Sequence, residues 1–244
     1  MTPPLLLLIP GLLNDARVWA PVRALLGDAA EVLVADVATG DTIADIAAFA
    51  WALLHDVPAT QRLVIAGFSM GGYIAQQMLA TAPRRVDSLA LVSTSARPES
   101  AEGMLVREKT IAAMERDFAK VVEGILAFGT HENFRADPAA VDGLRTMMLT
   151  IGAETGRRQT RAIMRRADQR DNARRLTLPT LVMVGDSDRI TPPELDDELA
   201  ALLPHARHER LPDCGHMAPL EQPQRVADAL LSLLNLPPPK EATP

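Results

Sequence analysis

The 244-residue chain has few cysteines and few aromatic residues, and it lacks any excess of positive charge. Its single cysteine, Cys214, excludes a disulfide within the chain and fits a reducing compartment, so we expect a cytoplasmic protein. A net charge of −6 argues against a nucleic-acid partner. With 3% aromatic residues, a binding groove built from stacked rings is not expected.

Long hydrophobic runs are also absent. The apolar stretch at 5–9 is much shorter than a membrane span, and no positively charged segment precedes it, so we expect neither a signal peptide nor a membrane partner. Hydrophobic residues make up 48% and charged residues 23% of the chain, which is typical of a globular protein. The length allows one sizeable core together with an insertion.

Short apolar runs recur along the chain, and helical patterns separate most of them. Uniformly apolar runs of this length are typical of parallel strands that are covered on both faces. We expect such strands at 5–9, 31–35, 63–66, 88–92 and 179–184, and a final, more polar strand near 206–211. This alternation predicts an α/β fold with a doubly wound, mainly parallel sheet of about six strands.

One long segment interrupts the alternation. Residues 97–176 have helical periodicity and no strand pattern, over a length far beyond that of an ordinary connection. We expect helices here at 104–114, 118–128, 141–151 and 155–170. The segment is therefore predicted to form a helical cap, inserted into a core made of 1–96 and 177–244. Its methionines and phenylalanines either attach the cap to the core or line an apolar pocket.

The turn Gly67-Phe68-Ser69-Met70-Gly71 follows the third apolar run and opens a helical pattern. A serine in such a sharp turn projects its hydroxyl above the sheet, and the flanking glycines leave room for it. The helix that begins at Met70 directs free backbone N–H groups at that hydroxyl. The pattern predicts a serine nucleophile beside an oxyanion site, although a turn that only packs a helix on a strand has the same form.

Two further polar residues, Asp188 and His216, also follow strand ends. A serine hydroxyl needs a base to remove its proton, and the base needs a carboxylate to fix its tautomer. Each residue alone is also compatible with a structural role, as a core histidine and a turn aspartate. Because the carboxyl ends of parallel strands share one edge of a sheet, Ser69, Asp188 and His216 together predict a catalytic triad.

With these motifs, the chain resembles the α/β-hydrolase superfamily over nearly its whole length. The resemblance rests on Gly67-x-Ser69-x-Gly71, on Gly185-Asp186-Ser187-Asp188-x-x-x-Pro192, and on Gly215-His216 followed by Glu221-x-Pro223. The family order of serine, acid and histidine is preserved. The resemblance implies a serine nucleophile at position 69, an acid at 188 and a base at 216.

The chain departs from the family pattern in two places. The family usually has His-Gly after its third strand, whereas this chain has Pro10-Gly11. Aligning Gly11 with the family glycine implies an oxyanion hole formed by the N–H groups of Leu12 and Met70. The first two antiparallel strands of the family are missing, so the resemblance implies the strand order 4-3-5-6-7-8 in family numbering.

Three carboxylates compete for the role of partner to His216. Asp186 lies two residues before Asp188, and Asp213 lies three residues before the histidine. The family spacing favours Asp188. Asp186 is expected to brace the turn, and Asp213 to form one.

The cap carries a basic segment, 157–166, in which Arg157, Arg161 and Arg165 share one helical face. One interpretation is a solvated face that pairs with acidic residues of the protein. The other is that an arginine, for which Arg161 is the test case, holds a carboxylate of the substrate.

Other polar residues point to no additional chemistry. His205 and His208 lack a metal-ligand pattern, and there is no phosphate-binding loop, so we expect neither a metal nor an organic cofactor. His131 is expected in a surface loop, and Cys214 is expected to pack rather than to act as a nucleophile.

These patterns predict a serine hydrolase, and first a carboxylesterase that cleaves small to medium apolar esters through an acyl-enzyme on Ser69. The partner is then a small-molecule ester or related acyl compound. The same triad serves lactonases, thioesterases, C–C bond hydrolases and perhydrolases, since the cap decides the substrate. From another class, a ligand receptor that turns over slowly or not at all has the same fold.

Overall fold

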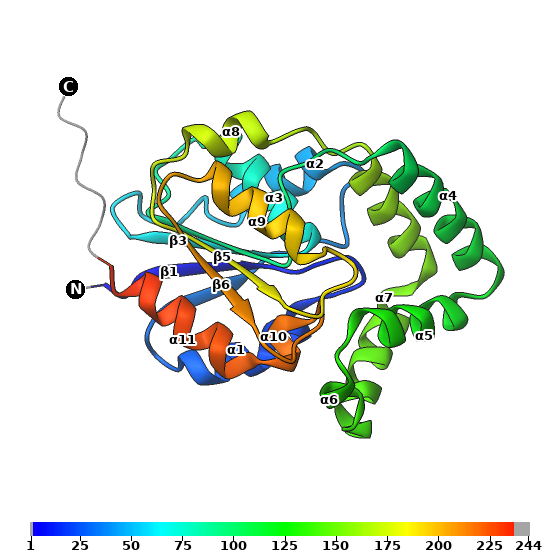
Figure 1. The fold of residues 1–244 in the computed structure, drawn as a ribbon. Helices are drawn as coiled ribbons and strands as arrows, with labels where there is room; N and C mark the ends of the chain where they lie inside the picture. Colours follow the sequence, from blue (N-terminus) through cyan, green and yellow to red (C-terminus); the bar gives the residue numbers. More distant parts are fainter. Residues whose placement is uncertain (1, 237–244) are drawn as a thin grey trace.

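The computed structural model describes residues 2–236, and within them six parallel strands form one twisted sheet (Figure 1). The strands are β1 (Leu5–Ile9), β2 (Glu31–Val34), β3 (Leu63–Phe68), β4 (Ser88–Val92), β5 (Thr180–Gly185) and β6 (Ala206–Leu211). Their spatial order is β2-β1-β3-β4-β5-β6, which confirms the order implied by the family resemblance. In register, Ile9 lies opposite Gly67, and Phe68 lies opposite Val92.

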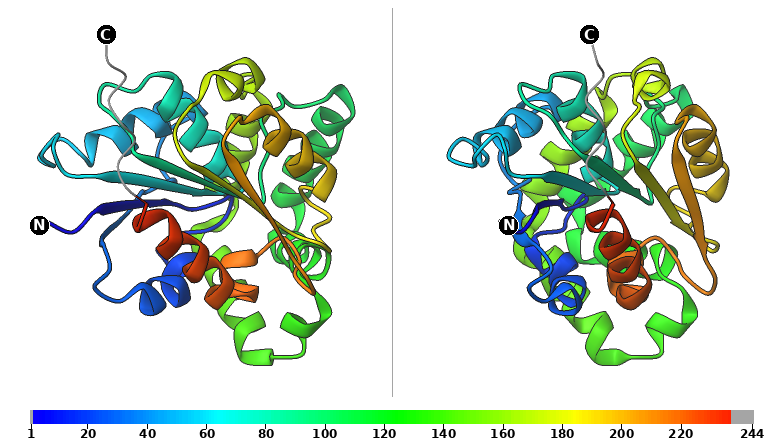
Figure 2. Two further views of the ribbon diagram at one scale, coloured as in Figure 1. Left: turned by 60° about the vertical axis from the view of Figure 1, so that its left-hand side comes forward. Right: turned by 90° about the vertical axis from the view of Figure 1, so that its left-hand side faces the viewer.

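Helices cover both faces of the sheet (Figures 1 and 2). One face is covered by η1 (Ala16–Trp19), α1 (Ala20–Leu26), α10 (Ala218–Glu221) and α11 (Pro223–Leu234), and the other by α2 (Ile43–Ala52), α3 (Met70–Ala80), α8 (Arg170–Arg175) and α9 (Pro193–Leu202). Side chains of a strand alternate between the faces. Thus Leu6 and Leu8 belong to one core, while Leu5 and Leu7 belong to the other.

Between β4 and β5, the chain forms helices and no strand. These are α4 (Ala101–Arg116), α5 (Phe118–Gly129), α6 (Glu132–Arg135) and α7 (Pro138–Met164), followed by α8. Helices α4 to α7 lie past the carboxyl ends of the strands (Figure 1), over the edge where the site residues were expected. The division of the chain into cap and core stays a prediction, and α8 packs against α3 and α9.

The helix expected over 155–170 ends earlier than the sequence predicted. Gly152, with φ of 85° and ψ of 161°, is not helical and lies between the helices expected at 141–151 and 155–170, so α7 consists of two helices joined at a kink, and the second ends at Met164. The chain then turns back to the sheet, where the N–H of Gln169 donates to the carbonyl of Ala96 at 2.9 Å. Residues 237–244, which the sequence assigned to the core, lie outside the described part of the chain. None of the described helices is long and apolar enough to cross a membrane.

Candidate active site

Ser69 occupies the tight turn between β3 and α3, and its backbone is strained. Its φ of 55° lies in the left-handed region, which a residue with a side chain rarely adopts. The turn is tight because backbone passes close on both sides: a Cβ on Gly67 would lie 2.3 Å from the Gly71 carbonyl oxygen, and one on Gly71 would lie 2.1 Å from that of Ile9. The two glycines of the motif are therefore required sterically.

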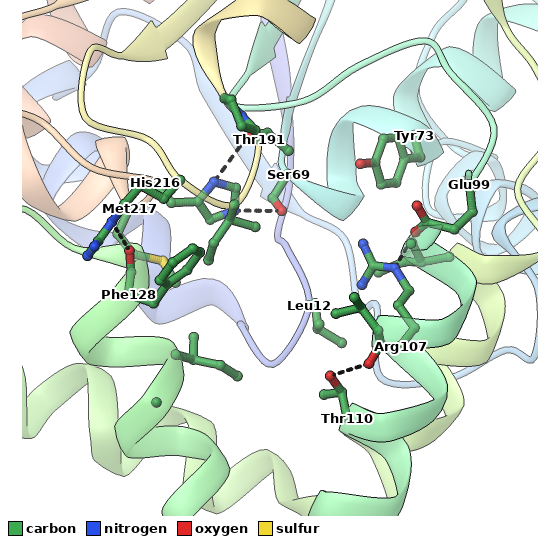
Figure 3. A pocket seen from close by; sticks show the side chains of 18 of the residues that line it. Leu12, Ser69, Tyr73, Glu99, Arg107, Thr110, Phe128, Thr191, His216 and Met217 are labelled. Carbon is green, nitrogen blue, oxygen red and sulfur yellow. Dashed lines mark hydrogen bonds and ion pairs between the residues drawn. The ribbon is translucent and has the colours of Figure 1, made fainter. Parts of the chain in front are cut away.

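The structure brings Ser69, His216 and Asp188 into one hydrogen-bonded chain (Figure 3 shows the serine and the histidine). The Oγ of Ser69 lies 2.9 Å from Nε2 of His216, and Nδ1 of the same ring lies 2.8 Å from Oδ2 of Asp188. Because the carboxylate accepts from the Nδ1–H, Nε2 carries the lone pair and accepts from the serine hydroxyl. This is the arrangement in which a histidine can take the serine proton.

Asp188 is buried, at 2% exposure, and every one of its oxygen atoms has a donor. Oδ1 accepts from the backbone N–H groups of Ile190 and Thr191, both at 2.9 Å, and Oδ2 also accepts from the Thr191 hydroxyl at 2.8 Å. Burial raises the pKa of this carboxyl, but His216 and the Thr191 hydrogen bonds outweigh it and hold the pKa below its ordinary value. Asp188 is therefore held as an ionised acceptor.

The other two carboxylates near this edge are not partners of His216. Asp186 is exposed and accepts a hydrogen bond from the neighbouring Ser187 hydroxyl at 2.9 Å. Asp213 is exposed as well and occupies a turn with φ of 53°. The side-chain contacts therefore single out the position that the family spacing favoured.

A partly buried glutamate holds the loop that carries His216. Glu221 accepts from the backbone N–H groups of Gly215 and Met217, at 2.9 and 2.8 Å, and from that of His131 at 2.8 Å. The N–H of His216 donates to the carbonyl of Gly129, at the end of α5. The histidine loop is thus fastened to the helices that overhang it. Burial raises the pKa of Glu221, although the three backbone donors oppose this.

The two expected oxyanion donors lie at the start of α3 and in the loop after β1. Within the described residues, neither the N–H of Leu12 nor that of Met70 donates to another group. The neighbouring Leu13 has φ of 56°, and its N–H donates to Oε1 of the buried Gln159 at 2.9 Å. Gln159 also donates to the carbonyl of Val37 at 2.9 Å, so a side chain of α7 fixes the curl of this loop.

A cavity of about 780 Å³ opens next to Ser69 and His216. Apolar side chains from the loop after β1 and from α4 and α5 form much of its wall: Leu12, Val106, Val121, Ile125 and Phe128. Arg107, Glu99 and Arg189 add charge (Figure 3 labels the first two). The helices between β4 and β5 therefore form much of the wall.

The basic face of α7 does not reach this cavity. Arg161 and Arg165 are exposed and do not line it, so the hypothesis that Arg161 holds a substrate carboxylate is wrong. Arg157 pairs with Glu154 and Glu115, as the alternative interpretation of this face predicted. The periodic pattern identified a shared face, but the direction in which α7 turns that face depends on its packing.

Cys214 packs inside the protein, as the sequence suggested. Cys214 is fully buried, and burial raises the pKa of its thiol. His208 pairs with the buried Asp196 at 3.0 Å, away from the cavity, and burial raises the pKa of that carboxyl to about 8. Among the described residues, no group of three or more histidine, cysteine or acidic side chains is arranged to hold a metal ion.

Comparison with known proteins identifies the family. A model described as the alpha/beta hydrolase family matches residues 6–229. The chain belongs to this family. Its named relatives include a pimeloyl-[acyl-carrier protein] methyl ester esterase from Chromobacterium violaceum, 30% identical over 68% of this chain and 67% of the relative. Two other curated relatives, both from Mycobacterium tuberculosis, are matched over 66% of their length.

Solved structures of α/β hydrolases share the whole fold. A thermophilic esterase from Thermogutta terrifontis superposes with a TM-score of 0.86 at 29% identity, covering 96% of this chain and 90% of that one. The enol-lactonase from Burkholderia xenovorans LB400 has the same TM-score at 23% identity, covering 97% and 93%, and is similar in fold. The family membership and the esterase relatives thus support a hydrolase of this fold.

Proposed function

We propose that this α/β hydrolase is a carboxylesterase that works through an acyl-enzyme on Ser69. The proposal rests on one observation above all: the unbroken hydrogen-bonded chain from Ser69 through His216 to the buried Asp188, beside a cavity. His216 takes the serine proton as Oγ attacks the ester carbonyl carbon, and Asp188 stabilises the imidazolium that forms. His216 then gives that proton to the leaving alcohol oxygen, and the acyl group stays on Ser69.

Water then releases the acyl group from Ser69 as a carboxylic acid. His216 removes a proton from the water as it attacks the acyl carbon, and then returns the proton to Oγ, which regenerates the enzyme. In both steps the carbonyl oxygen carries negative charge. The N–H groups of Met70 and Leu12 are the proposed donors to that oxyanion, because neither donates to another described group and both flank the serine turn.

The cavity supports esters of small to medium size. Its mainly apolar wall favours the transfer of alkyl groups out of water, by about 0.8 kcal/mol for each buried methylene. The overhanging helices α4 and α5 enclose it in part, which disfavours long polymers and emulsions. The cavity therefore favours small to medium esters that are dissolved in water.

The test is a series of p-nitrophenyl esters, from acetate to decanoate, with the wild type, Ser69→Ala and Ser187→Ala. Ser187 is an exposed serine near the same edge, and within residues 2–236 its hydroxyl forms a hydrogen bond only with Asp186. We expect a maximum among the shorter esters, loss of at least about 10³-fold in kcat for Ser69→Ala, and wild-type rates for Ser187→Ala. Undiminished hydrolysis by Ser69→Ala would refute the proposal. Slow turnover of every ester, with tight ligand binding, would indicate a receptor.

A further inference from the structure

Arg107 projects from α4 into the cavity, on the side away from His216 (Figure 3). Its Nε donates to Oε2 of Glu99, which lies just before α4. Within residues 2–236, this is the only hydrogen bond that Arg107 makes, so the two Nη nitrogens of the guanidinium have no acceptor in the described part of the chain. They lie at the wall of a cavity that a substrate must enter.

The carboxylate of Glu99 is shared by two arginines. Its Oε2 also accepts from Nη1 of Arg166 at 2.9 Å. Burial raises the pKa of Glu99, but the hydrogen bonds from Arg166 and Arg107 outweigh it and lower the pKa, so this residue is ionised. Two guanidinium groups therefore face one carboxylate, and the cluster has a net charge of +1.

Arg166 is not available to a ligand in the cavity, because its side chain is nearly buried and does not line the cavity. Its side chain is 7% exposed, Nε donates to the Arg97 carbonyl at 2.8 Å, and Nη1 also donates to the carbonyl of Ile163 at 3.1 Å. The guanidinium stacks on the ring of Tyr73, with its central carbon 4.5 Å from the ring centroid. Arg166 thus supports Glu99, and the side chain of Arg107, at 25% exposure, presents the charge.

The remaining charged groups of the wall do not neutralise Arg107. Glu102 is exposed in the first turn of α4 and forms no ion pair among the described residues. Arg189 stacks on Phe128 and donates to the carbonyls of Ala127 and Phe128, at 3.0 and 3.1 Å, at the end of α5. Its Nε and Nη2 donors are therefore used at a helix C-terminus, where a cation is favourable.

We infer that Arg107 binds a carboxylate on the acyl part of the substrate, so that the preferred esters are monoesters of dicarboxylic acids. The inference rests on the proposed esterase function. His216 must protonate the leaving oxygen, so the alcohol lies on its side of Ser69 and the acyl chain points the other way, towards Arg107. A planar guanidinium with two unoccupied Nη nitrogens suits a carboxylate, to which it can donate two parallel hydrogen bonds.

The test compares matched methyl esters, with methanol release followed by NMR. The monomethyl esters of dicarboxylic acids, from succinate to suberate, are compared with methyl esters of the monocarboxylic acids of equal carbon number. For the wild type, we expect kcat/KM to favour the charged ester at one chain length. In Arg107→Gln, the ratio of charged to neutral kcat/KM should fall by about 10- to 100-fold, as expected for a lost hydrogen bond to a charged group.

Two further variants sharpen the comparison. Arg107→Lys keeps the charge but loses the fork, so its ratio should lie between the wild type and Arg107→Gln. Arg161→Gln removes the same charge from the exposed face of α7 and should keep the wild-type ratio. Free glutarate should inhibit the wild type more strongly than Arg107→Gln, and circular dichroism should show both to be folded.

The possible failures are distinct. If the wild type cleaves neutral esters and shows no preference for a charged acyl chain, the role of Arg107 is wrong while the esterase stands. That role is also wrong if Arg107→Gln keeps the preference, or if a carboxylate on the alcohol part is preferred. If no ester of either kind is cleaved, the proposed function itself fails.

Discussion

Replacing Asp188 by asparagine should disable the enzyme without unfolding it, because the surroundings dictate how the amide must lie. Oδ1 accepts two backbone N–H groups, so only the amide oxygen can take its place. The amide nitrogen is then forced into the position of Oδ2, facing Nδ1 of His216. An NH₂ group cannot accept from Nδ1–H, so the ring must move its proton to Nε2 and can no longer take the serine proton.

The magnitude follows from the loss of the correct tautomer and of the charge that stabilises the imidazolium. For a serine triad this combination costs about 10⁴ in kcat, or about 5.5 kcal/mol in activation free energy. We expect Asp188→Asn to lose about 10³- to 10⁴-fold in kcat for a short p-nitrophenyl ester, with little change in KM. The Tm should change by a few degrees at most, since the amide keeps the two backbone hydrogen bonds.

The control variants are Asp186→Asn and Asp213→Asn, which change the two exposed carboxylates near the same edge. Both should stay within about threefold of the wild-type kcat, because surface changes away from special features have small effects. A folded Asp188→Asn enzyme that loses less than about tenfold in kcat would refute the assigned role. Loss of activity in Asp213→Asn instead would place the partner of His216 in its own loop.

Three further predictions concern the frame of the site. Gly71→Ala places a methyl group 2.1 Å from the Ile9 carbonyl oxygen and should lower the free energy of unfolding by about 3 kcal/mol or more. The control Gly143→Ala, in open space on α7, should raise the free energy of unfolding by about 0.5–1 kcal/mol. Thermal melts check both. Glu221→Gln should lower kcat about 10-fold or more with a smaller effect on KM. The single amide oxygen can accept from the N–H groups of Gly215 and His131, but the amide nitrogen then faces the N–H of Met217, from which it cannot accept. Cys214 should react with a thiol reagent at pH 8 only after unfolding, since burial raises its pKa and keeps it protonated; fast labelling of the folded protein would contradict this.

The sheet could be predicted from the sequence because its strands are encoded locally. An apolar run of this length, such as Leu5–Ile9, predicts a strand whose two faces are both covered by other parts of the protein. The turn around Ser69 is also recognisable locally, and Gly67 is required because the Gly71 carbonyl lies against it, although Gly71 itself is required by the distant Ile9 carbonyl of β1. The strand order followed from the family resemblance rather than from the residues alone.

The rest of the site depends on contacts between distant parts of the chain. Gln159 fixes the loop of Leu13 from 146 residues away, and Glu221 reaches His131 across 90 residues. Nothing in the periodicity of α7 indicates that Gln159 turns inwards while its neighbour Arg161 turns outwards. Likewise, no sequence pattern indicates that Arg107, rather than Arg161, borders the cavity.

The most direct test of the proposed mechanism is to locate a covalent fluorophosphonate adduct. The wild-type protein should gain the mass of one adduct, fragmentation should place it on Ser69, and ester hydrolysis should be lost in step with labelling. Asp188→Asn should label far more slowly than the wild type, and Ser69→Ala should not label. An adduct on another residue, or full ester hydrolysis by protein labelled on Ser69, would contradict the central claim that this serine is the nucleophile.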